Sequence, residues 1–133
     1  MKCLLIFVLI GSLNFFGCKK PAIENTKTSS KNITGKWNYT QAFYSMGGPL
    51  IFTSTAERNQ SILFETDSSF SSNVPAFENF NSFRMEDSAK IKFLSATQQE
   101  RIYFYRIDSL QNSLTLSPAD FICIEGCGDI FKK

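Results

Sequence analysis

The chain has 133 residues and no histidine. Without histidine it cannot form the Ser-His-Asp or Cys-His groups of common hydrolases, an HExxH zinc site or a histidine proton shuttle. The acidic pair Glu86-Asp87 falls in a predicted turn among polar neighbours, and no nucleophile stands within reach of a base. We therefore predict a protein that is not an enzyme and that binds no metal or cofactor.

Helical periodicity is also missing. No segment sustains apolar residues at the 3.6-residue spacing of an amphipathic helix. The one long apolar run, from Cys3 to Phe16, is shorter than the ~20 residues that a membrane-spanning helix needs. Because the charged start Met1-Lys2 precedes it, this run is typical of a secretory signal.

The end of the run, Phe15-Phe16-Gly17-Cys18, resembles the lipobox of bacterial lipoproteins, which has an apolar residue, a small residue, Gly or Ala, and Cys. Phe16 stands where that pattern has the small residue. The resemblance implies that residues 1–17 are removed as a signal peptide and that Cys18 is diacylated through its sulfur. Two or more acyl chains anchor a protein stably to a membrane. The alternative is an ordinary secreted protein in which Cys18 only ends the apolar run.

Residues 18–32 are rich in Lys, Ser, Thr and Asn, which predicts a flexible tether. Four lysines and one acidic residue give this segment a net charge of +3, whereas nine basic and eleven acidic residues give residues 33–133 a net charge of −2. This distribution fits a basic tether beside an anionic membrane and argues against a nucleic-acid partner. Acidic residues after the cysteine send some lipoproteins to the cell surface. Because Lys19-Lys20 stand there instead, we predict an outer-membrane, lipid-anchored protein that faces the periplasm. We also expect it to be a monomer.

The remaining chain, residues 33–133, alternates apolar and polar residues in short segments separated by turn residues. It predicts strands at residues 35–44, 61–65, 70–73, 82–85, 90–94, 101–107, 114–116 and 129–132. Residues 45–60 are expected to be a long connection in which Leu50-Ile51-Phe52 packs as a lid. Residues 77–83 carry Phe at every third position, which leaves a short helical turn and an irregular connection both open.

Gly35-x-Trp37 at the start of a strand, the long first loop and the meander of hairpins resemble the lipocalin, or calycin, pattern. The closing residues 114–132, with Cys123-x-Glu-Gly-Cys127, resemble small lipocalin-like lipoproteins of Gram-negative envelopes. The resemblance implies an all-β, antiparallel up-and-down barrel of eight strands over residues 33–133. The Thr-Asp-Tyr motif of lipocalins is absent. In lipocalins a basic residue usually packs on the Trp that corresponds to Trp37, and the sequence does not identify this residue.

Aromatic residues at inward positions of the predicted strands are the candidate ligand-lining residues: Trp37, Tyr39, Phe64, Phe93, Tyr103 and Tyr105. They either surround a cavity for a small apolar or amphipathic ligand, with a mouth near residues 50–52 and 77–80, or fill the interior of a solid barrel. Trp37 is expected at the closed end. Two functions remain open: a membrane-tethered binder of a small ligand, and an envelope structural or protein-interaction module.

Cys123 and Cys127 lack the further soft ligands that a zinc site needs, since the sequence has no histidine and Cys18 is predicted to be acylated. On the oxidising side of a membrane a disulfide between them is the preferred interpretation, with a turn at Gly126. Asp87-Ser88-Ala89 and Asp108-Ser109-Leu110 resemble the acceptor sites for O-glycosylation in some Gram-negative envelopes. Both also lie where turns require Asp and Ser.

Overall fold

The computed structural model describes residues 32–120 and 126–133. The predicted signal peptide, Cys18, nearly all of the tether and Cys123 lie outside these residues. The regular structure is almost entirely β-strand, with a single short 3-10 turn, η1 (Ala56–Arg58). The strands are β1 (Gly35–Tyr44), β2 (Ile51–Ser54), β3 (Ser61–Phe64), β4 (Phe70–Ser72), β5 (Phe80–Met85), β6 (Lys90–Ser95), β7 (Glu100–Asp108), β8 (Ser113–Pro118) and β9 (Cys127–Lys132).

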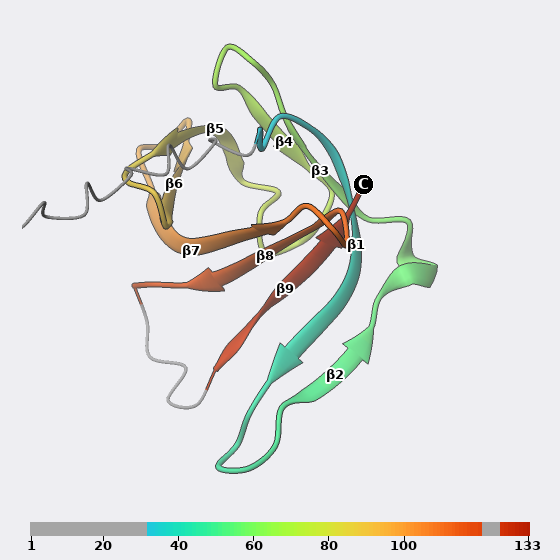
Figure 1. Ribbon diagram of the computed structural model, residues 1–133. Coiled ribbons are helices and arrows are strands. Elements are labelled where there is room, and N and C mark those ends of the chain that lie inside the picture. The colour runs from blue at the N-terminus through green and yellow to red at the C-terminus, as the bar shows by residue number, and fades with distance from the viewer. Residues whose placement is uncertain (1–31, 121–125) are drawn as a thin grey trace, which may run out of the picture.

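The strands pair antiparallel in the order β4-β3-β1-β9-β8-β7-β6-β5, and β2 adds to the free part of β1 (Figure 1). The two ends of this order meet at one isolated bridge between Ser69 and Ser82. Beside it, the backbone N–H of Phe83 donates to the carbonyl oxygen of Ser68 at 3.0 Å. The result is an antiparallel, nearly closed, eight-stranded barrel-like sheet, as the sequence predicts.

β1 is the longest strand and pairs with three others. Its first half, from Gly35 to Asn38, pairs with β3, and its second half, from Gln41 to Tyr44, pairs with β2. Its other edge pairs with β9 from Asn38 to Tyr44, with a register shift at Thr40. The Thr40 hydroxyl donates to the carbonyl oxygen of Ile130 at 3.0 Å. A bulge of this kind increases the local twist, so β1 can serve both ends of the barrel.

The expectation of a long connection over residues 45–60 that carries a lid is wrong, because this segment contains β2 and η1. Ile51 and Phe52 begin a strand, β2, that Leu50 directly precedes, and all three residues are exposed rather than packed as a lid. Gly47 adopts a φ of 98°, which suits the reversal between β1 and β2 and favours glycine. The apolar residues therefore form a hairpin that extends beyond the neighbouring strands at the bottom of Figure 1.

Inward side chains from every strand except β2 form one hydrophobic core. Alternation along the strands places these residues inside, as in Ile91 and Phe93 of β6. The connection between β4 and β5 contributes as well, through Phe77, which has no exposed surface. The N–H of Phe77 donates to Val74 O at 2.8 Å and that of Phe80 to Phe77 O at 3.1 Å, so this connection is a series of tight turns.

Candidate functional site

The six candidate lining residues come from β1, β3, β6 and β7, and the barrel brings them together in its interior. Five are buried: Trp37, Tyr39, Phe64, Phe93 and Tyr103. Tyr105 is partly buried and packs against the same core. The sequence therefore identified inward-facing positions correctly, but their contacts decide whether they border a space or fill it.

Phe93 lies at the centre of a network of aromatic rings. Its ring centre is 4.8 Å from that of Phe70, 5.3 Å from Phe77 and 5.5 Å from Tyr103. Phe77 also reaches Phe131 of β9, at 6.1 Å between ring centres. Rings at these separations are in direct contact. This part of the interior is packed by aromatic side chains that touch one another.

Residues 77–80, where a hollow barrel would have opened, also contribute to this packing. Phe77 is fully buried and Phe80 is nearly so, and both rings contact Phe93. The three-residue spacing of Phe77, Phe80 and Phe83 arises because tight turns, followed by a bulge in β5, aim each ring inward. The connection thus inserts a side chain into the core where a hollow barrel would have an entrance.

Trp37 lies near the start of β1 and is 2% exposed. Its Nε1 donates to the carbonyl oxygen of Ile33 at 2.7 Å. A cation that the sequence did not identify contacts this ring, since Lys133 Nζ lies 4.6 Å from the Trp37 ring centre. A cation over an indole ring is favourable electrostatically. No local signal could have assigned Lys133, because only the pairing of β1 with β9 brings it there.

The carboxylate of Asp129 in β9 is hydrogen-bonded to Tyr39, whose ring stacks on that of Phe131. The Tyr39 hydroxyl donates to Oδ1 of Asp129 at 2.6 Å. Burial raises the pKa of Asp129, although the hydrogen bond from Tyr39 opposes that shift. Burial, with a smaller contribution from the Asp129 charge, raises the pKa of Tyr103 to about 12. The sequence did not single out Asp129, because its pattern there is that of an ordinary strand.

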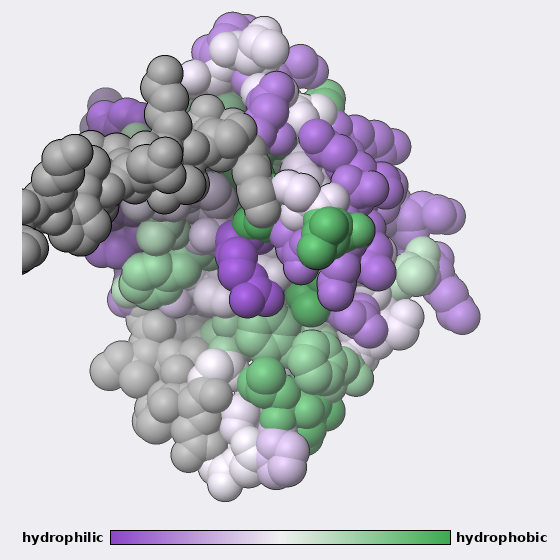
Figure 2. Space-filling model, viewed as in Figure 1, coloured by the Kyte–Doolittle hydropathy of each residue, from purple (hydrophilic) through white to green (hydrophobic). Residues whose placement is uncertain are grey.

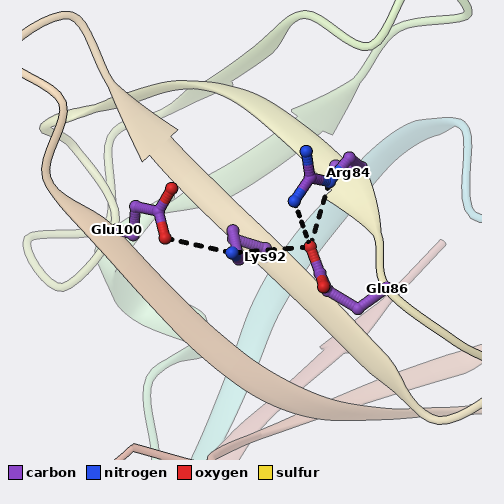
Figure 3. Close-up of polar contacts among 4 residues, drawn as sticks. All are labelled: Arg84, Glu86, Lys92 and Glu100. Carbon is purple, nitrogen blue, oxygen red and sulfur yellow. Dashed lines mark hydrogen bonds and ion pairs between the residues drawn. The ribbon is translucent and has the colours of Figure 1, made fainter.

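The outer face of β5, β6 and β7 carries a chain of four charged residues (Figure 3). Arg84 Nη2 is 2.7 Å from Oε1 of Glu86, and Lys92 Nζ is 3.0 Å from Oε2 of Glu100 and 3.6 Å from Glu86. The Arg84 hydrogen bond lowers the pKa of Glu86, and the Glu100 hydrogen bond raises the pKa of Lys92. The network contains two positive and two negative charges, and its ion pairs link β5, β6 and β7.

The largest exposed apolar residues of the described chain gather mainly at the β1–β2 hairpin. We call residues 44–52 the hairpin tip; its exposed members are Tyr44, Met46, Leu50, Ile51 and Phe52. The Phe52 ring also contacts Phe43 on the paired strand, at 5.9 Å between ring centres. Figure 2 shows a hydrophobic patch on the lower part of the molecule, where Figure 1 places this hairpin.

The two serines of the proposed glycosylation motifs lie in exposed turns. Asp87 Oδ1 accepts the backbone N–H groups of Ala89 and Lys90, and Asp108 Oδ1 accepts those of Leu110 and Gln111. Each aspartate therefore has a structural task in closing its turn. Ser88 and Ser109 follow these aspartates at the β5–β6 and β7–β8 hairpins.

Two further observations concern the described residues alone. No cluster of three or more acidic or cysteine side chains in them could hold a metal ion. They contain no helix with the length and apolarity to cross a membrane.

Cys127 begins β9, and its predicted partner Cys123 falls in the part of the chain that is not described, so the disulfide stays a prediction. Gly126, beside it, has a φ of 109°, which permits the expected turn.

Comparisons with protein-family models, with curated proteins and with solved structures give no match. The arguments for function therefore rest on the sequence motifs and on the geometry of the barrel.

Proposed function

We propose that the protein is a non-enzymatic module of the bacterial envelope, anchored through acylated Cys18, that acts through the surface of a filled lipocalin-like barrel. The observation that carries this proposal is the contact of the interior rings with one another. A cup for a ligand needs lining atoms that have no protein neighbours. Here Phe93, Phe77 and Tyr103 are one another's neighbours.

The filled interior is tested by comparing the protein with a variant in which a cavity has been made. Phe77→Ala removes a ring that touches four others, Phe70, Phe93, Tyr103 and Phe131. Apolar cavities made in this way stay dry and bind xenon or benzene. We expect xenon to shift the NMR signals of core methyl groups in Phe77→Ala and to leave the wild-type protein unchanged. Equal xenon binding by the wild type would mean that the barrel is hollow.

The anchor rests on the lipobox-like end of the signal segment. We expect Cys18→Ala to abolish acylation and to release the protein from the membrane fraction, whereas Cys3→Ala, in the part that is removed, changes nothing after processing. Protease added to intact cells should leave the domain uncut if Lys19-Lys20 retain it on the periplasmic side. Tight membrane association of the unacylated Cys18→Ala protein, or cleavage in intact cells, would contradict these two points.

Binding of a small amphipathic ligand is the second candidate function, and Asp129 is the observation that favours it. Its partly buried carboxylate has one described hydrogen-bond donor, Tyr39, and so retains capacity to accept another from a ligand. This site would take a compound with an apolar body and a donor group. Loss of a co-purified compound on Asp129→Leu, with the fold intact, would support this function over the first.

A further inference from the structure

The hairpin tip exposes apolar side chains on both of its faces. Tyr44 and Ile51 are register partners, as are Phe43 and Phe52, so successive residues of β2 point to opposite faces of the hairpin. Both faces are open: Ile51 is 46% exposed and Phe52 is 53% exposed. At the turn, Met46 is 83% exposed. Apolar side chains are thus exposed on both faces of the hairpin and at its turn, as suits a segment that enters a lipid layer.

The same segment is free of charge. Residues 37–56 contain no Asp, Glu, Lys or Arg, although charged residues make up 20% of the chain. Edge strands of soluble proteins are usually protected against association by charged residues, especially lysine. β2 pairs with β1 alone among the described strands, and it carries no such residue. Transferring this tip out of water therefore requires no desolvation of a charged group.

The open edge of β2 also limits how deep the hairpin can go. Backbone groups without partners are not tolerated in the hydrocarbon core of a bilayer. The interfacial layer still offers water to those groups, and apolar side chains enter that layer to a depth of about 5–10 Å. The turn and the first residue of β2 suit this depth.

The chain is long enough to allow the contact. The described domain begins at Asn32, fourteen residues after Cys18. Fully extended, fourteen residues reach at most about 50 Å, and a ten-residue strand such as β1 spans about 33 Å. The tether joins β1 at the end opposite the hairpin tip, so it can run the length of the barrel and still leave the tip at the same membrane (Figure 1).

We propose that the hairpin tip, residues 44–52, inserts into the interfacial layer of the membrane that holds the acyl anchor. This inference rests on the proposed function, because the anchor supplies the membrane. The occupant of the apolar patch is thus lipid, bound through its acyl-chain boundary and without a preference for anionic headgroups. Insertion fixes the barrel with its β1–β2 end on the membrane and with the Trp37–Lys133 end away from it.

Brominated lipids, which quench tryptophan at short range, test this orientation in the intact acylated protein reconstituted in phosphatidylcholine vesicles. Met46→Trp places a reporter at the tip. Leu110→Trp is the matched control, because Leu110 is 96% exposed at the β7–β8 hairpin, which lies beside Lys133 at the opposite end of the barrel. The native Trp37 supplies a constant buried background. We expect bromine to quench Met46→Trp strongly, and to leave Leu110→Trp and the wild type at their intensities in unbrominated vesicles.

Vesicle flotation separates the failure of this inference from the failure of the anchor. If the protein floats with the vesicles and Met46→Trp is not quenched, the hairpin inference is wrong and the anchor stands. Quenching that persists in Cys18→Ala would show that the tip binds lipid without the anchor. A blue-shifted Met46→Trp emission without quenching would assign the patch to a second copy of the chain or another protein and overturn the inference. A chain that does not float contradicts both proposals.

Discussion

Lys133 Nζ lies over the ring of Trp37, 4.6 Å from its centre, and donates a hydrogen bond to the carbonyl oxygen of Thr34 at 3.0 Å. The chain thereby ties the end of β9 to the start of β1. The N–H of Lys133 also donates to the carbonyl oxygen of Asn112 at 3.1 Å, so the β7–β8 turn belongs to the same closure. One residue connects three segments around the buried indole.

The first prediction concerns this closure. Trp37→Ala should lower the free energy of unfolding by about 3–5 kcal/mol, because it leaves a cavity in a packed site. Lys133→Met keeps the apolar stem and removes the charge, and should cost about 0.5–1 kcal/mol at this exposed position. Lys36 is exposed on β1, the strand that contains Trp37, so Lys36→Met is the control and should change the free energy of unfolding little. Urea unfolding measures all three, and an unchanged midpoint for Trp37→Ala would refute the closure.

The second prediction concerns Asp129. Burial raises its pKa in the folded protein above the unfolded value of about 3.9, so the folded state favours the protonated form. Asp129 therefore makes its whole contribution to stability at pH values below its pKa in the unfolded chain. That contribution is lost as the pH rises through its pKa in the folded protein. Asp129→Asn, which can still accept from Tyr39, should be more stable than the wild type at pH 7. That advantage should shrink towards pH 3.

Asp67 provides the opposite case. Hydrogen bonds from Ser69 lower its pKa, so its contribution is present above the unfolded pKa and is lost as pH falls through the folded pKa. Asp67→Asn should therefore lose stability at pH 7 and resemble the wild type in acid. Parallel pH profiles for the two variants would mean that the folded protein lowers the pKa of Asp129, which would contradict the effect of burial at that site.

A third prediction follows from the close approach of β9 to β8 and β1. A methyl group added at Gly128 would come within 2.5 Å of the carbonyl oxygen of Leu116 and 2.8 Å of Cζ of Phe43. Gly128→Ala should cost about 1–3 kcal/mol, since backbone atoms must move. Gly48→Ala is the control, because nothing lies within 4 Å of its added methyl group. Thermal unfolding of both variants gives the comparison, and equal melting temperatures would contradict the packing at Gly128.

The fourth prediction is the disulfide between Cys123 and Cys127. With Cys18 acylated and residues 1–17 removed, we expect no free thiol in the mature protein. Closing so short a loop contributes only ~2 kcal/mol on the chain-entropy model, so Cys123→Ser/Cys127→Ser should fold with a modest loss of stability. Thiol labelling under denaturing, non-reducing conditions measures the pair. Two reactive thiols per chain would mean that it is reduced.

Much of the barrel could be predicted from local alternation. The first strand was placed correctly at residues 35–44, because Trp37 and Tyr39 alternate with polar residues and Gly35 precedes them. β2 was missed because Ile51 and Phe52 are both exposed and give no alternation. The contact of Lys133 with Trp37 and the insertion of Phe77 depend on strand pairing and turn geometry. A single sequence does not encode these in any local pattern.

The central claim, a filled barrel that acts through its surface, is tested most directly by native mass spectrometry of the protein purified from its membrane. We predict a mass equal to residues 18–133 plus the acyl groups on Cys18, less two hydrogens for the disulfide, with no further compound. A stoichiometric additional mass that disappears when the protein is unfolded would show a bound ligand in the barrel and contradict the claim.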